Sequence, residues 1–126
     1  MLSVFYGKTQ VNGQRLEKIK VVNQPSINIR GEKETYYTLI ISDPDASSAD
    51  FLHWLVMNIN KDRYQEILSY KSPNPVSGSH RYNLYLLEQD GKILLEPFDR
   101  NDFNVSDFIS RYGLDFKDTQ FFSVKA

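Results

Sequence analysis

The 126-residue sequence has no cysteine, two histidines and one tryptophan. Without cysteine the chain has no disulfide framework, no thiolate nucleophile and no thiolate metal ligand. Excess charge of either sign is also missing, because 15 Lys and Arg face 16 Asp and Glu for a formal charge of −1. This balance gives no electrostatic reason to expect nucleic acid or an anionic membrane surface as the main partner. Any anion binding must therefore be local.

Long apolar runs are absent as well. No stretch approaches the roughly 20 apolar residues of a membrane span, and the segment from Met1 to Gly7 lacks the features of a signal peptide. A chain of this length suits one domain with one core. We therefore expect a single cytoplasmic domain over residues 1–126, with no integral membrane association and no nucleic-acid partner.

The apolar segments are short, rich in β-branched and aromatic residues, and bounded by turn residues, as is typical of strands. Strands are predicted at residues 2–7, 18–21, 25–30, 36–41, 51–59, 81–87, 93–95 and 121–124. Residues 36–41 and 51–59 are the most apolar and are expected in the middle of the sheet. The dipeptide Asp90-Gly91 predicts a tight hairpin between 81–87 and 93–95. Residues 63–70 fit a strand or a helix equally well.

The remaining segments are expected to form turns, loops and one helix. Residues 47–50 are a short polar loop, and residues 72–79 hold two prolines and a glycine, which exclude regular structure. A helix is predicted at residues 104–113, with Asn104 as N-cap and Gly113 as its stop. The chain is therefore predicted to be mainly β, with one helix near its C-terminal end.

Candidate chemistry gathers around the apolar strand at 36–41. Two carboxylates, Asp43 and Asp45, follow it directly and flank a proline, which fixes the backbone so that the two side chains can point apart. His53 opens the next apolar strand, and His80 follows the proline-rich loop. With Tyr82, these residues make one candidate pocket at the rim of the core.

Four motifs occur in order: Asp43-Pro44-Asp45-Ala46, Leu52-His53-Trp54-Leu55-Val56, Pro73-Asn74-Pro75 and Gly78-Ser79-His80-Arg81-Tyr82. Together they resemble the phosphatidylethanolamine-binding protein family, which includes the Raf kinase inhibitor proteins and the plant flowering regulators. The likeness is closer to the plant branch and covers essentially the whole chain. The resemblance implies an antiparallel Greek-key β-sandwich with a C-terminal helix.

Three departures from the family pattern limit what carries over. The family commonly has a proline where this chain has Ser47, so that wall of the pocket is expected to be looser. The chain starts later than most members and lacks the extended C-terminal tail of the mammalian ones. Partner contacts assigned to those two segments are therefore not expected here.

The resemblance implies a small cavity that accepts a phosphate-like anion or a phospholipid headgroup. The expected ligand-binding residues are Asp43, Asp45, His53, Pro75, Gly78, His80 and Tyr82. The histidines are the obvious donors, and a carboxylate on the second ring nitrogen would favour their protonated form. Asp43 is expected in that role.

Each of the other residues has an expected place in this pocket. Asp45 is expected to hold Arg81 or the backbone of the proline loop, because a second bare carboxylate would oppose an anion. Tyr82 is expected to donate its hydroxyl at the mouth. Pro75 supplies a rigid wall, and Gly78 lets a ligand approach the backbone.

The preferred interpretation is a non-catalytic binding or regulatory module without a cofactor. Its ligand would be a phosphate-bearing small molecule, headgroup or phosphorylated peptide, and a kinase is one possible protein partner. A hydrolase or protease inhibitor using the same His/Asp cleft is the alternative, since a general base needs a histidine oriented by a carboxylate. A metal site from His53, His80, Asp43 and Asp45 is weaker, because their spacings match no tight metal-binding pattern.

Overall fold

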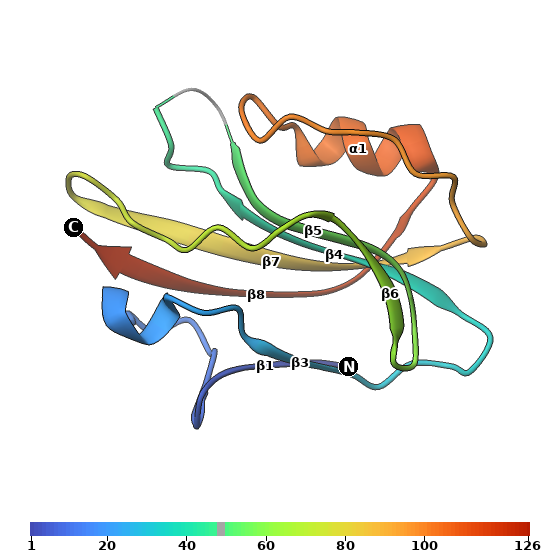
Figure 1. The fold of residues 1–126 in the computed structure, drawn as a ribbon, viewed down its shortest axis with the longest axis horizontal. Helices are drawn as coiled ribbons and strands as arrows, with labels where there is room; N and C mark the ends of the chain where they lie inside the picture. Colours follow the sequence, from blue (N-terminus) through green and yellow to red (C-terminus); the bar gives the residue numbers. More distant parts are fainter. Residues whose placement is uncertain (48–49) are drawn as a thin grey trace.

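The computed structural model describes residues 1–47 and 50–126, which form two β-sheets and a short α-helix (Figure 1). The strands are β1 Leu2–Tyr6, β2 Thr9–Gln10, β3 Ser26–Ile29, β4 Tyr36–Asp43, β5 Phe51–Asn60, β6 Arg63–Leu68, β7 Ser79–Gln89 and β8 Asp115–Lys125. The helices are the 3₁₀ turn η1 Lys18–Val21 and the α-helix α1 Val105–Tyr112. Within the described ranges no helix is long and apolar enough to cross a membrane.

The strands pair in two antiparallel sheets. The large sheet has the order β6-β5-β4-β7-β8 and the small sheet the order β2-β1-β3. Strands β4, β5 and β6 follow one another, and β7 then returns to lie beside β4, which is the strand order of a Greek key. The predicted mainly-β Greek-key sandwich with a helix near the C-terminal end is confirmed.

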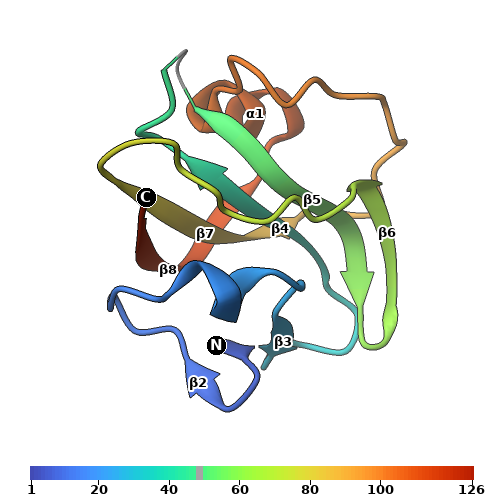
Figure 2. The same ribbon diagram turned by 60° about the vertical axis from the view of Figure 1, so that its left-hand side comes forward.

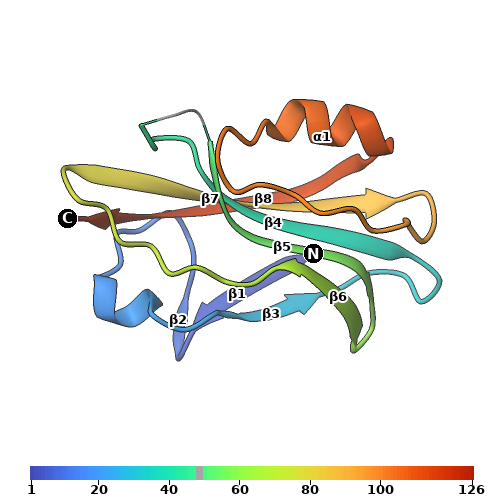
Figure 3. The same cartoon turned by 45° about the horizontal axis from the view of Figure 1, so that its top comes forward.

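The small sheet and α1 cover opposite faces of the large sheet (Figures 2 and 3). One apolar cluster fills the space between the two sheets and includes Val4, Leu39, Trp54, Tyr82 and Phe122. A second cluster lies under the helix and includes Ile40, Leu55, Met57, Phe103 and Phe108. Because it is covered on both faces, β4 is buried from Tyr37 to Asp43, which agrees with its nearly continuous apolar sequence.

The predicted helix at 104–113 is confirmed as α1. The side chain of Asn104 accepts a hydrogen bond from the Asp107 amide at 3.0 Å, and Gly113 ends the helix with a positive φ of 60°. The hairpin between β5 and β6 resolves the ambiguity of residues 63–70, since Arg63–Leu68 is a strand. Of the polar loop at 47–50, residues 48 and 49 lie outside the described residues.

Residues 18–21 are a 3₁₀ turn, so the predicted strand there is wrong. The Lys20 amide donates to the Glu17 carbonyl at 2.9 Å, and the Tyr70 hydroxyl donates to the Val21 carbonyl at 2.7 Å. Val21 is fully buried, whereas Ile19 is 75% exposed. Only one of the two apolar residues of the alternating pattern, Val21, is buried. A turn can bury this single side chain without pairing the segment in a sheet.

Residues 93–95 are not a strand either, although they follow the predicted Asp-Gly turn. Asn58, which has a φ of 55°, uses its side chain to bind both the amide and the carbonyl of Ile93, at 2.8 and 3.0 Å. Gln89 donates to the Asn58 side chain and accepts from its backbone amide. These buried amides replace the hairpin ladder that the turn sequence predicted.

Asn58→Ala is expected to lower the free energy of unfolding by about 2–4 kcal/mol, because it removes the partner of both backbone groups of Ile93 and one of the two acceptors of Gln89 Nε2, and because it puts alanine at a positive φ. The exposed Asn101→Ala is the control, with a change under about 0.5 kcal/mol. Urea unfolding of both variants measures the difference. A loss for Asn58→Ala as small as that of the control would contradict this account of the loop.

Candidate functional site

The predicted site residues meet where β4 ends and β5 and β7 begin. Asp43 lies opposite Phe51 in the β4–β5 pair, and His80 and Tyr82 lie opposite Val124 and Phe122 in the β7–β8 pair. Side chains of directly opposed residues share a face of the sheet. Because Val124 and Phe122 belong to the cluster between the sheets, the site lies at one end of that same face.

A β-bulge brings His53 into this site. The register pairs Ile41 with Trp54 and Ser42 with Leu52, so His53 is the extra residue of β5. Strict alternation would place Phe51 and Trp54, three residues apart, on opposite faces. The bulge lets Phe51 and Trp54 share the inner face, and the His53 ring lies 5.0 Å from Phe51 and 5.2 Å from Tyr82.

Asp43 and His80 form the central contact of the site. The His80 Nδ1 atom lies 2.7 Å from Asp43 Oδ2, and Asp43 Oδ1 accepts the Asp45 amide at 2.8 Å. Asp43 is 4% exposed, so its carboxylate depends on these two donors for compensation. With its Nδ1–H given to the carboxylate, His80 keeps Nε2 for a ligand. This is the contact that the sequence predicted for Asp43.

Asp45 holds Arg81, as expected, and does so through three bonds. Its carboxylate accepts the Arg81 amide at 2.8 Å, Nε at 3.0 Å and one terminal guanidinium nitrogen at 2.9 Å. The hydrogen bonds from Arg81 lower the pKa of Asp45 to about 2. The Asp45 charge is therefore neutralised by its own partner.

His53 lies in a different environment from His80. Its Nδ1–H donates to the Lys71 carbonyl at 2.6 Å, since a carbonyl oxygen only accepts. Burial lowers the pKa of His53 below its ordinary value, and the positive charges of Arg100 and Lys71 act in the same direction. The neutral tautomer with hydrogen on Nδ1 is therefore favoured, which leaves Nε2 as a hydrogen-bond acceptor.

The remaining predicted site residues differ in how far they are buried. Tyr82 is 1% exposed and its ring stacks on Phe122 at 5.3 Å, so the ring is part of the inner core. Donation by its hydroxyl at the mouth stays a prediction. Burial raises the pKa of the Tyr82 hydroxyl, and the negative charge of Asp43 raises it further. Pro75 is buried, whereas Gly78 is exposed with a φ of 65° and accepts the Ala126 amide at 2.8 Å.

Arg100 belongs to the site although sequence reasoning missed it. Its guanidinium donates to the carbonyls of Leu52 and His53, both at 3.1 Å, and to that of Ser69 at 2.6 Å. It thereby holds the segment leading to Lys71 against β5 and fixes the carbonyl that orients the His53 ring. The residue lies in an irregular stretch 47 positions from His53, so no local pattern indicates it.

Asp50 is the third carboxylate near the site. Burial raises its pKa, and the negative charges of Asp43 and Asp45 raise it further. No group of three or more His, Cys, Asp or Glu side chains that could hold a metal ion occurs among the residues with a described position. The described groups can therefore form hydrogen bonds through two imidazole rings beside a buried carboxylate.

The Greek-key sandwich and its imidazole-carboxylate site define a small β-sheet binding protein. The family model for phosphatidylethanolamine-binding proteins matches residues 6–120, and the chain belongs to this family. It is 33% identical to Protein MOTHER of FT and TFL1 homolog 2 of Oryza sativa subsp. japonica, over 90% of this chain and 74% of that protein. It is 36% identical to Protein FLOWERING LOCUS T of Arabidopsis thaliana, over 90% of this chain and 72% of that protein.

Solved structures confirm the fold. The carboxypeptidase Y inhibitor, complexed with its cognate proteinase, superposes with a TM-score of 0.88 at 20% identity, over 99% of this chain and 82% of that one. A phosphatidylethanolamine-binding protein from Plasmodium vivax gives a TM-score of 0.79 at 18% identity, over 98% and 84%. The resemblance to the family and its plant members is confirmed. Family and relatives support a regulatory binding role over an enzymatic one.

Arg100→Ala is expected to destabilise the fold by about 1.5–3 kcal/mol, because three carbonyl groups lose a charged donor. It should also raise the pKa of His53, since the nearby positive charge is removed. Arg63→Ala, an exposed arginine of β6, is the matched control. Chemical denaturation and an NMR pH titration of the His53 ring measure the two effects, and an unchanged pKa of His53 would contradict the positioning role.

Stability is expected to fall as pH drops below about 6.5, the ordinary pKa of an unfolded histidine. In that range the unfolded chain protonates His53, whereas folding holds its pKa lower, so the unfolded state binds more protons. His53→Gln keeps a donor for Lys71 but cannot titrate, and it should show a shallower slope of unfolding free energy between about pH 7 and 5. Equal slopes for the two proteins would refute the assignment.

Proposed function

We propose that the chain is a non-catalytic regulatory module whose pocket at the ends of β4, β5 and β7 binds a phosphate-bearing ligand. The observation that carries the proposal is the Asp43–His80 contact. The Asp43 side chain is 6% exposed and the His80 side chain 20%. The buried carboxylate therefore holds an imidazole ring that solvent can partly reach. Free phosphate, a phosphorylated headgroup and a phosphorylated peptide share the group that such a ring would bind.

The two histidines are suited to opposite ends of one hydrogen-bonded ligand. His80, when protonated, donates from Nε2 to a phosphate oxygen, with its Nδ1–H retained by Asp43. His53 is neutral and offers its Nε2 as an acceptor. A ligand that carries both an anionic oxygen and a hydrogen-bond donor fits this pair, as hydrogen phosphate and phosphoethanolamine do. Sulfate at neutral pH has no proton to donate and fits less well.

Charge within the site supports the same ligand class. Arg81 neutralises Asp45, and His80 faces Asp43. What remains is a site with little net charge, which suits a ligand held by directed hydrogen bonds. It does not suit indiscriminate binding of polyanions, in agreement with the balanced charge of the whole chain.

We propose that the regulatory role is exercised on a protein partner, with a kinase as one candidate. A phosphorylated peptide segment of the partner is the form of ligand that would couple the pocket to protein binding. The relatives that resemble this chain include Protein FLOWERING LOCUS T and Protein TERMINAL FLOWER 1 of Arabidopsis thaliana, and family membership supports a regulatory role.

A hydrolase is the competing function, because the Asp43–His80 contact is also the arrangement that orients a general base. Incubation with p-nitrophenyl phosphate and p-nitrophenyl acetate distinguishes the two. Binding without turnover supports the module. Turnover that disappears in Asp43→Asn would make the site catalytic and would overturn the proposal.

The proposal predicts that titrated inorganic phosphate, phosphoethanolamine and a phosphoserine peptide shift the NMR signals of His53 and His80 together, while sulfate binds more weakly. Signals of both histidines that stay in place with all three phosphate ligands would overturn the proposal.

Variants separate binding from folding. His80→Gln and Asp43→Asn are expected to weaken phosphate binding by about tenfold or more, the effect of losing a charge-assisted hydrogen bond. Asp90→Asn is the matched control for Asp43→Asn, since Asp90 is exposed and follows the opposite end of β7. Phosphate affinity unchanged in both site variants, with the fold intact, would mean that the pocket does not bind phosphate.

A further inference from the structure

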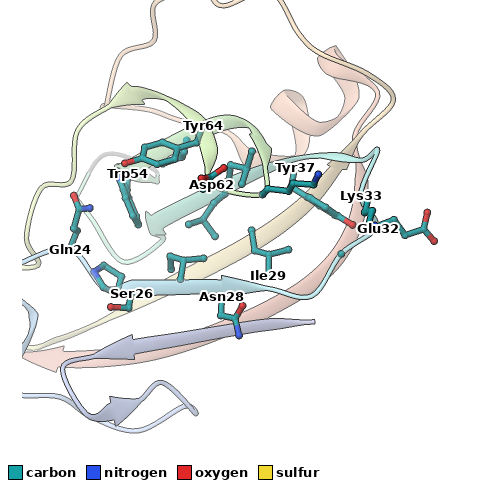
Figure 4. A pocket seen from close by; sticks show the side chains of 17 residues that line it. Gln24, Ser26, Asn28, Ile29, Glu32, Lys33, Tyr37, Trp54, Asp62 and Tyr64 are labelled. Carbon is teal, nitrogen blue, oxygen red and sulfur yellow. The ribbon is translucent and has the colours of Figure 1, made fainter.

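A cleft of about 780 Å³ lies between the two sheets (Figure 4). Its lining does not include the His/Asp site. Its walls come from β3 on one side and from β4, β5 and β6 on the other. The apolar floor is formed by Ile27, Ile29, Leu39, Trp54, Val56 and Ile59. A volume of this size with an apolar floor is typical of a binding site. None of the residues that line it belongs to the predicted phosphate pocket.

The cleft exists because the two layers differ in width. Three strands of the small sheet cover a sheet of five, and β3 is the edge of the small sheet while β6 is the edge of the large one. Ile27 and Ile29 are half-buried against the inter-sheet core, whereas Tyr64 on β6 is 57% exposed. The inner face of β5 and β6 therefore lacks the cover that a further strand beside β3 would give.

The backbone of β3 is free to accept such a strand. The Arg30 amide donates to the Met1 carbonyl at 2.7 Å, and residues of an antiparallel pair bond to their partner alternately. Asn28 therefore bonds to Ser3 of β1, and Ile27 and Ile29 direct their N–H and C=O groups toward the open edge. Across the described ranges, β3 pairs with β1 alone.

The cleft runs along this edge. Ser26 and Asn28, whose side chains alternate with those of Ile27 and Ile29, line it too, so it is open beside β3 as well as beneath it. An occupant in this position meets two free N–H and two free C=O groups of one strand and an apolar floor below. Extended peptide backbone is the chemical group that satisfies both features at once.

We propose that β3 binds an extended peptide segment of a partner protein, which adds to the small sheet as a fourth strand over β5 and β6. Alternate side chains of the peptide enter the cleft and contact Trp54 and Ile59, while its backbone bonds to Ile27 and Ile29. The rim carries Glu32, Lys33, Lys61 and Asp62, which have both signs of charge. The matching peptide alternates apolar and uncharged polar residues.

A phage library of linear peptides of about twelve residues, panned on the full chain, supplies the probes. Trp54 is the sole tryptophan and lines the cleft, with Nε1 bonded to Glu66 at 2.7 Å, so its emission reports occupancy. Selected peptides are expected to show the alternating pattern, to change this emission and to slow amide exchange at Ile27 and Ile29 by about tenfold or more.

Ile27→Pro removes one outward N–H without removing a bond to β1, and Ile27→Val keeps the N–H with a similar side chain. Binding should weaken by about three- to tenfold in the proline variant relative to the valine variant, which is the effect of one backbone hydrogen bond. Equal affinity in the two folded variants would overturn the proposal. The amide exchange of the unsubstituted chain keeps the test decisive if the proline variant does not fold.

Two other occupants are distinguished by the same measurements. A library that yields no peptide, together with Trp54 emission that responds to the dye 8-anilinonaphthalene-1-sulfonate, would assign the cleft to small amphipathic molecules and overturn strand addition. Concentration-dependent dimers in sedimentation, together with slowed amide exchange at Ile27 and Ile29, would assign the edge to a second copy of the chain. This outcome would also overturn the proposal.

Discussion

The buried carboxylate of Asp43 is the constraint on which the site depends. A carboxylate at the end of a central strand loses its hydration, and this loss is tolerated only when donors replace the water. Here the donors are the His80 ring from β7 and the amide of Asp45, which ends the same turn. The compensation of one charge thereby fixes how β4, β7 and the Asp-Pro-Asp turn meet. The same contact occupies one ring nitrogen of His80 and leaves Nε2 for a ligand.

Local sequence patterns correctly predicted the elements whose apolar pattern and end residues match their burial in the fold. The apolar run of β4, the long strand β5 and the capped helix α1 are of this kind. The segments at 18–21 and 93–95 were predicted wrongly, because distant side chains decide them: Tyr70 holds the carbonyl of Val21, and Asn58 binds both backbone groups of Ile93. A strand pattern of three or four residues is too weak to resist such contacts.

The candidate site divides in the same way. The sequence indicated that Asp43 would bond to a histidine and that Asp45 would hold Arg81 or the proline loop, and the contacts with His80 and Arg81 agree with this. The bulge at His53 could not be predicted, because it appears only in the register between β4 and β5. Arg100 could not be predicted either, since it acts through backbone carbonyls, which leave no mark on the sequence. Sequence reasoning therefore identified the side chains of the candidate site, but it did not identify the groups that orient them.

The bulge also explains how one strand serves two separate places. His53 is turned toward Phe51 and Tyr82, whereas the next residue, Trp54, packs its ring 5.7 Å from Tyr70 and lines the inter-sheet cleft. Between them the hydroxyl of Tyr6 bonds to that of Tyr70 at 2.8 Å, and both rings are held by the core. Contacts between aromatic rings thus run from the His/Asp site to the cleft between the sheets. The proposed phosphate binding and the proposed strand addition depend on different residues and can therefore be tested independently.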